Sequence, residues 1–178
     1  MHLFEKTLES KHIYDGKILK VTVDTVELEN GQTALREVVH HYGGVCVVAV
    51  TENNEIIFVN QFRYPFNDVL LEIPAGKIDK GEEHFECGKR ELLEETGAVA
   101  SDYKYLGVMY PTTGYLTEKI HMYLAQGLTF EEQSLDNDEF LDVVKIPFDK
   151  AIEMILNNEI PDGKTQVAIL KAARILNK

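Results

Sequence analysis

The segment that most constrains this chain is a short helix whose carboxylates gather at the unfavourable end. A helix is expected over residues 83–96, with Gly97 as its stop. Its last two turns carry three acids, Glu91, Glu94 and Glu95. Carbonyl groups at a helix C-terminus already carry partial negative charge, and side chains three or four positions apart project together and repel. The fold must therefore bring positive charge to this helix.

Arg90 is the nearest cation, and it can partner one of these carboxylates, most simply Glu94 at i+4. It cannot neutralise all three. Most acidic runs on helices are solvated faces, and that interpretation stays open here. The other interpretation is a metal site, because hard carboxylate oxygens that converge on one point are what Mg²⁺ or Mn²⁺ prefers.

The loop before the helix favours the metal site. Gly76 and Gly81 allow the backbone to approach a ligand closely, and Glu82 and Glu83 add acid to the same neighbourhood. A phosphate loop of the P-loop type is excluded, because Glu82 stands where that loop needs a lysine.

The rest of the chain predicts a mixed α/β sandwich in which helices cover a mixed sheet. Residues 18–28 alternate like a strand, Asn30-Gly31 suits a tight turn, and 33–41 read as the returning strand. These form an N-terminal antiparallel β-hairpin arm. A buried strand is expected at 45–50, and helices are expected after Pro147 and from about Lys164.

Charge and composition exclude several classes of function. Lys and Arg number 18 against 30 Asp and Glu, a net charge of −12 that disfavours nucleic acid and anionic membranes as partners. The longest apolar runs are far below the ~20 residues of a membrane span. Cys46 and Cys87 form no disulfide framework, so a reducing, cytoplasmic location is expected.

Gly76, Glu82 and the string Arg90-Glu-Leu-Leu-Glu-Glu-Thr-Gly97 stand at the spacing of the Nudix box. The chain thus resembles the Nudix hydrolase family, with Ala98 as the one departure, where a larger aliphatic residue is usual. The strings at 61–64 (QFRY), 71–76 (LEIPAG) and 160–165 (IPDGKT) resemble its ADP-ribose pyrophosphatase branch.

The resemblance implies a Nudix-type α/β/α sandwich with an N-terminal arm at 1–42 and a hydrolase domain at 43–178, whose box is 76–98. It implies that Glu91, Glu95 and the Ala75 carbonyl ligate Mg²⁺ or Mn²⁺, and that Glu94 assists. Glu82 and Arg90 would orient these carboxylates.

The implied reaction is metal-dependent attack of water on the pyrophosphate bond of ADP-ribose, giving AMP and ribose 5-phosphate. Thr113 stands where this branch often has a proline, so another nucleoside diphosphate sugar, such as GDP-mannose, is the alternative. A non-catalytic nucleotide sensor on the same fold is a third reading, although such sensors commonly lose box glutamates.

Three further residues are candidates for substrate binding. Arg63 is expected to hold a diphosphate oxygen, against the alternative of a surface arginine. Glu72 either bonds the substrate or braces the loop after it. Arg36 either lines the adenosine pocket of a partner subunit in a homodimer, as the resemblance implies, or forms a cross-strand ion pair.

The general base is expected in the acidic segment 136–139. The resemblance implies that Asp138 or Glu139 takes this role or binds a further metal, and a solvated loop is the alternative.

Overall fold

The chain divides into two units in this computed structural model, which describes residues 3–137 and 139–178. The first unit comprises the described residues up to Gly43 together with 110–119. The second comprises 44–109 and 120–178, again within the described part. The box segment lies wholly in the second unit.

The first unit is built on a three-stranded antiparallel sheet in the order β1 (Lys6–Asp15), β2 (Lys20–Glu27) and β3 (Thr33–His40). The predicted turn is present: Gly31 has a φ of 79°, and its N–H donates to the Leu28 carbonyl at 2.9 Å. The predicted hairpin of β2 and β3 is thus present, but the prediction lacked β1, which adds a third strand. Every residue of β1 is exposed, so no buried face marked it in the sequence.

The segment 110–119 joins the first unit through the end of β3. The Val39 N–H donates to the Tyr115 carbonyl at 2.7 Å, and the Thr117 N–H donates to the Val39 carbonyl at 2.9 Å. These two bonds give a short parallel bridge between Val39 and Leu116.

The second unit contains two sheets. The four-stranded sheet has the order β7 (Ala75–Lys77), β4 (Gly44–Ala49), β9 (Ile120–Phe130), β8 (Ala98–Met109). It is mixed, because β4 and β9 run parallel and the other neighbours antiparallel. The three-stranded antiparallel sheet has the order β10 (Leu141–Pro147), β5 (Glu55–Arg63), β6 (Asp68–Glu72).

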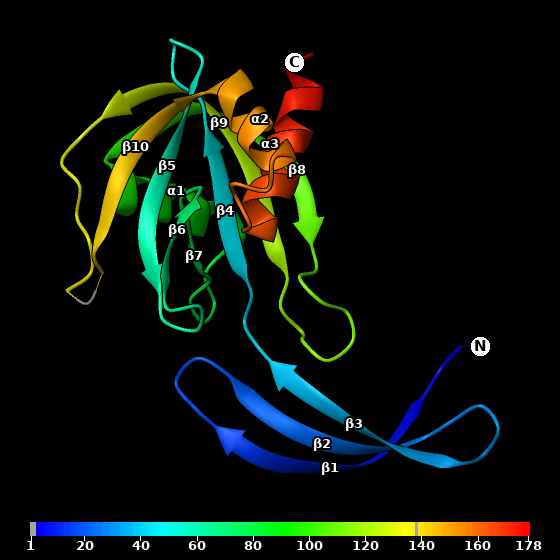
Figure 1. The fold of residues 1–178 in the computed structure, drawn as a ribbon. Helices are drawn as coiled ribbons and strands as arrows, with labels where there is room; N and C mark the ends of the chain where they lie inside the picture. The colour runs from blue at the N-terminus through cyan, green and yellow to red at the C-terminus, as the bar shows by residue number, and fades with distance from the viewer. Residues whose placement is uncertain (1–2, 138) are drawn as a thin grey trace. The chain divides into compact units, whose positions relative to one another are not determined.

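The strand β4 is buried along its whole length, and its side chains alternate between two hydrophobic cores. Cys46 and Val48 belong to the core under α2 (Phe148–Leu156) and α3 (Gly163–Ile175), whereas Val45 and Val47 belong to the core under α1 (His84–Thr96). A strand buried on both faces needs helices on both sides, and Figure 1 shows α1 on one side and α2 with α3 on the other. The predicted α/β sandwich is confirmed.

Membrane crossing by a helix has no support in the described residues. None of their helices combines the length and the apolar character that such a span requires.

Candidate active site

The helix α1 begins at His84 and ends at Thr96, close to the predicted bounds. Gly97 follows in the left-handed region with a φ of 69°, and its N–H donates to the Leu93 carbonyl at 2.7 Å. No basic residue stands in the last turn of α1. The conflict between acidic side chains and helix end that the sequence predicts is therefore present in the fold.

Two of the predicted metal ligands, Glu91 and Glu95, are buried, with 8% and 2% of their surface exposed. Both lie against the β7 backbone. The Ala75 N–H donates to Oε2 of Glu95 at 3.0 Å. A Cβ added at Gly76 would lie 1.9 Å from the Glu91 carboxyl carbon, so a larger residue here would displace the Glu91 carboxylate from its present position. Ala75, Gly76 and the two carboxylates thus form one close-packed group.

Burial raises the pKa of both carboxyls, to about 7 for Glu91 and about 8 for Glu95. The negative charge of Glu139 raises both further, so Glu139 lies within electrostatic range of the pair. A cation bound between these groups would lower both pKa values and favour the charged carboxylates at neutral pH. Neighbouring carboxylates with raised pKa values in one buried place are typical of a functional site.

The donor set fits a divalent cation. Glu91 and Glu95 supply hard carboxylate oxygens, and the glycine at 76 lets the backbone approach them. Within residues 3–137 and 139–178, no three side chains of His, Cys, Asp or Glu are grouped closely enough to hold a metal. A site here would therefore combine two carboxylates with a main-chain oxygen, as expected for the Ala75 carbonyl.

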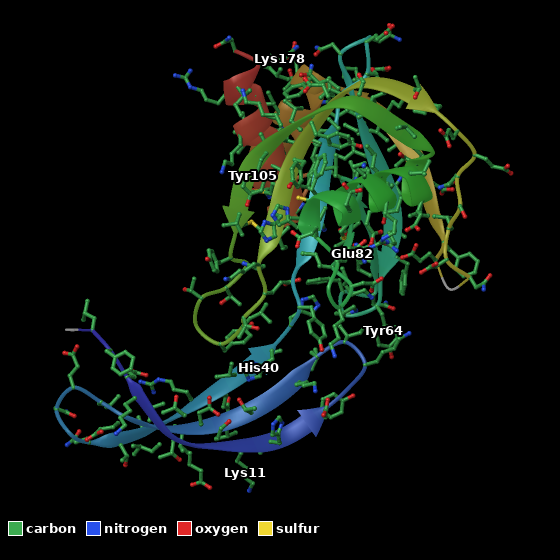
Figure 2. All side chains as sticks on the ribbon, turned by 180° about the vertical axis from the view of Figure 1, so that it is seen from behind. Lys11, His40, Tyr64, Glu82, Tyr105 and Lys178 are labelled. Carbon is green, nitrogen blue, oxygen red and sulfur yellow. The ribbon has the colours of Figure 1, made fainter. Side chains whose placement is uncertain are left out.

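Arg90 contacts three carboxylates, more than the single partner that the sequence predicted. It donates to Glu82 from Nε at 2.9 Å and from Nη2 at 3.0 Å, and its Nη1 donates to Glu91 at 2.8 Å and Glu94 at 2.9 Å. The hydrogen bonds from Arg90 lower the pKa of Glu82 to about 2. Glu82, which Figure 2 labels beside α1, also accepts from the Asp79 N–H at 3.0 Å. Arg90 and Glu82 therefore tie the loop to the helix, whereas Glu95 receives no bond from Arg90.

Glu72 at the end of β6 is 2% exposed and is bound by two cations. Arg63 at the end of β5 donates to it from Nε at 2.6 Å and from Nη2 at 2.8 Å. Lys164 in α3 also donates to Oε2 of Glu72. Burial alone raises the pKa of Glu72, but the bonds and charges of Arg63 and Lys164 outweigh it, and the net pKa lies below its ordinary value. This geometry favours the bracing alternative for Glu72.

Lys164 and its second partner Asp162 were not identified from the sequence as site residues. Lys164 contacts Asp162 at 3.0 Å. The string 160–165 contributed only to the resemblance, and no side chain in it was assigned a role. One sequence signal could have identified these two residues. The chain places a lysine and an aspartate at the start of a helix, and it also places a glutamate inside an apolar strand that needs a charged partner.

The residues that precede the acidic segment 136–139 are mostly exposed, yet their backbone covers the end of α1. The N–H groups of Glu131 and Ser134 donate to the carbonyls of Gly97 at 2.7 Å and Glu94 at 3.1 Å. These bonds satisfy carbonyl groups that a helix C-terminus leaves unpaired. Glu139 follows, and its N–H donates to the Asp136 carbonyl at 3.0 Å. Of the two expected general bases, Glu139 is described and Asp138 lies outside the described residues.

Arg36 lies in the first unit, on β3, and pairs with Glu5. Its Nε donates to Oε2 at 2.9 Å and its Nη2 to Oε1 at 2.6 Å. Both side chains are 42% exposed, so the pair is a solvated one.

Two family models match this sequence. The NUDIX domain matches residues 40–166, and the nucleoside diphosphate sugar hydrolase N-terminal domain matches residues 5–39. The chain belongs to the Nudix family. The predicted family is thereby confirmed, and the Nudix match covers α1 and the carboxylates on it.

Several curated proteins are similar to this Nudix chain over most of both lengths. A methanol dehydrogenase activator of Bacillus methanolicus is 42% identical, with 93% of this chain and 90% of the relative covered. An ADP-ribose pyrophosphatase of Bacillus subtilis is 41% identical, covering 94% and 91%. A GDP-mannose pyrophosphatase of Yersinia enterocolitica is 33% identical, covering 89% and 88%.

A solved structure shares the fold. The crystal structure of an ADP compounds hydrolase superposes with a TM-score of 0.86 at 21% sequence identity, covering 97% of this chain and 94% of the other. At that identity the match supports the Nudix architecture and carries no statement about substrate.

Proposed function

We propose that the protein hydrolyses the pyrophosphate bond of ADP-ribose to AMP and ribose 5-phosphate, with Mg²⁺ or Mn²⁺ as cofactor. The observation that carries this proposal is the burial of Glu91 and Glu95 against the backbone of Ala75 and Gly76. These two carboxylates and the Ala75 carbonyl would hold the cation. When bound, the cation would supply positive charge for the diphosphate and lower the pKa of a water molecule, so that loss of a proton makes this water a nucleophile toward phosphorus.

The protein's own residues do the remaining work. Arg63 binds a diphosphate oxygen by a charge-assisted hydrogen bond, since a third of its side chain is exposed. Arg90 holds Glu82, Glu91 and Glu94 in place through the bonds described above. The proton of the attacking water passes to a carboxylate, for which Glu139, Asp138 and Glu94 are the candidates.

ADP-ribose is preferred as substrate because the ADP-ribose pyrophosphatase relative is 41% identical and the GDP-mannose pyrophosphatase relative 33%. GDP-mannose is the alternative substrate. A non-catalytic nucleotide sensor is disfavoured, since such a protein has no need to keep two buried carboxyls at pKa values of about 7 and 8.

We further propose that the arm at residues 1–42 joins two copies of the chain in a homodimer. The hydrolase domain of each copy is then residues 43–178. The first unit leaves large apolar side chains more than half exposed, among them Ile13, Tyr14, Leu35 and Tyr42. Exposed apolar surface of this extent is typical of an interface. Arg36 gains little from its solvated pair with Glu5, so it can exchange that partner for a nucleotide bound by the other copy.

A cytoplasmic location is part of the proposal. Cys46 and Cys87 are both free and buried, which suits a reducing compartment.

A substrate panel tests the proposed reaction. ADP-ribose, GDP-mannose, a dinucleotide and ATP are incubated with the full chain, with Mg²⁺ or with EDTA, and the products are separated. We expect AMP and ribose 5-phosphate from ADP-ribose, at a kcat/KM above that for GDP-mannose, and no turnover in EDTA. Faster hydrolysis of GDP-mannose would establish the alternative substrate. No turnover of any member would favour the sensor.

A further inference from the structure

Four charged side chains meet where the ends of β5 and β6 approach the start of α3. Arg63 and Lys164 both donate to Glu72, and Lys164 also contacts Asp162 at 3.0 Å. Two cations face two carboxylates, so the set is neutral as a whole. We call these four residues the Glu72 cluster.

The backbone around the Glu72 cluster fixes where Lys164 can stand. Asp162 is the N-cap of α3 and accepts from the Thr165 N–H at 2.9 Å. The buried Thr165 hydroxyl accepts from the N–H of Ile73, the residue after Glu72, at 3.0 Å. The start of α3 is thus fastened directly to the strand that carries Glu72. Lys164 lies between the N-cap Asp162 and Thr165, and these two residues hold it beside this carboxylate.

Exposure increases outward through the cluster. The side chains of Glu72, Lys164 and Arg63 are 3%, 14% and 34% exposed. Arg63 uses Nε and Nη2 on Glu72, and across residues 3–137 and 139–178 its Nη1 has no hydrogen-bond partner. The charge of Glu95 also acts on Arg63, so the guanidinium lies near the proposed metal site. The most exposed member of the cluster, Arg63, therefore has a nitrogen, Nη1, whose N–H groups are available to a ligand.

We propose, on the basis of the hydrolysis proposed above, that Lys164 is a positioning residue for substrate binding. By binding Oε2 of Glu72 it keeps this buried carboxylate neutralised, which leaves Arg63 able to give Nη1, or its whole guanidinium, to a diphosphate oxygen. Without Lys164, Glu72 depends on Arg63 alone. Any movement of Arg63 toward phosphate then leaves the buried Glu72 carboxylate without a cation, which is strongly unfavourable.

The test compares Lys164→Met with Lys171→Met, a control at an exposed lysine of the same helix. We expect Lys164→Met to raise the KM for ADP-ribose about tenfold and to change kcat less than about threefold, because binding to phosphate is weakened and the chemical groups stay in place. Lys171→Met should match wild type. Lys164→Arg, which restores a cation, should recover at least half of the lost affinity on a logarithmic scale. A Lys164→Met variant with an unchanged KM would overturn the proposal.

A double-mutant cycle separates positioning from general support of the fold. In a Glu72→Gln background Lys164 keeps only Asp162 as a carboxylate partner and no longer neutralises a partner of Arg63, so adding Lys164→Met should change KM less than about twofold. The same tenfold rise in both backgrounds would mean that Lys164 acts without Glu72 and would overturn the proposal. Should Lys164→Met fail to fold, Lys164→Gln serves in its place with the same expectations, because it too removes the charge.

Calorimetric titration with ADP-ribose distinguishes failure of this inference from failure of the proposed function. Binding without hydrolysis by wild type would contradict the proposed reaction, and an about tenfold weaker Kd in Lys164→Met would still support the positioning role. An equal Kd would contradict that role alone. A wild-type chain that neither binds nor hydrolyses ADP-ribose would contradict both.

Discussion

Glu72 and Glu95 are equally buried, each with 2% of its surface exposed, yet their pKa values move in opposite directions. The pKa of Glu72 lies below its ordinary value, because Arg63 and Lys164 bind it despite the cost of burial. Burial raises that of Glu95 to about 8, and a single backbone N–H from Ala75 does not offset it. Equal burial therefore accompanies two different environments: two cations of the chain bind Glu72, whereas no cation among the described residues is bonded to Glu95.

The helix ends that hold these groups repeat the contrast. The C-terminal end of α1 carries acids where bases are favoured, and the first turn of α3 carries Lys164 where acids are favoured. At α3 the mismatch is resolved within the protein by Glu72 and Asp162. At α1 it is resolved only in part, by Arg90. Local rules are commonly broken at functional sites, and of these two ends only that of α1 keeps a carboxylate, Glu95, to which no described cation is bonded.

The largest expected effect concerns Glu95. Glu95→Gln should lower kcat at least about a hundredfold at saturating Mg²⁺, because the charge that the carboxylate holds in place acts on the transition state. Steady-state hydrolysis of ADP-ribose measures this. Glu86→Gln, at an exposed glutamate of the same helix, should keep wild-type turnover. Turnover of Glu95→Gln within threefold of wild type would remove Glu95 from the proposed site.

The next prediction tests the structural role of Glu72. Glu72→Ala should lower the free energy of unfolding by about 2 kcal/mol, because it leaves Lys164 and Arg63 without their buried partner. Denaturant unfolding in EDTA measures this. Under the same conditions Glu95→Gln should be at least as stable as wild type, since it removes an unneutralised buried carboxyl. Equal losses in the two variants would contradict the distinction between the two glutamates.

Substitutions in the acidic segment 136–139 should lower turnover, as expected for Glu95, rather than stability, as expected for Glu72. Glu139→Ala is expected to lower kcat about tenfold with little change in KM, because a general base acts in the chemical step. Asp138→Ala is the matched variant, and one of the two should show the larger loss. If both lose turnover equally and by less than twofold, the base is elsewhere, with Glu94 as the next candidate.

The last prediction is the pH dependence of the metal-free chain. The folded pKa of Glu95 is about 8 against an ordinary 4.5, so between these values the folded chain keeps a proton that the unfolded chain has lost. Stability should therefore fall as pH rises from 5 to 8, with about 3–4 kcal/mol as the upper bound for this group. Unfolding in EDTA at both pH values measures the fall, and it should be smaller in Glu95→Gln. An equal fall in that variant would assign it to other groups.

Much of the fold was predictable because its signals are local. The alternating strands β2 and β3, the Asn30-Gly31 turn and the bounds of α1 follow from residues that are neighbours in sequence. The strand β1 was missed for the same reason. All ten of its residues are exposed, so it carries no one-sided apolar pattern and depends on pairing with β2.

The sequence by itself determined that acids gather at one end of α1 beside a glycine, since helical spacing places Glu91, Glu94 and Glu95 together. Only the tertiary structure decided which carboxylate receives which cation. Glu72 meets Lys164 across 92 positions of the chain, and Arg90 turns to Glu82 as well as to Glu94. Charge pairing depends on distance through space and on the solvent removed around each group, and both quantities are set when the elements pack.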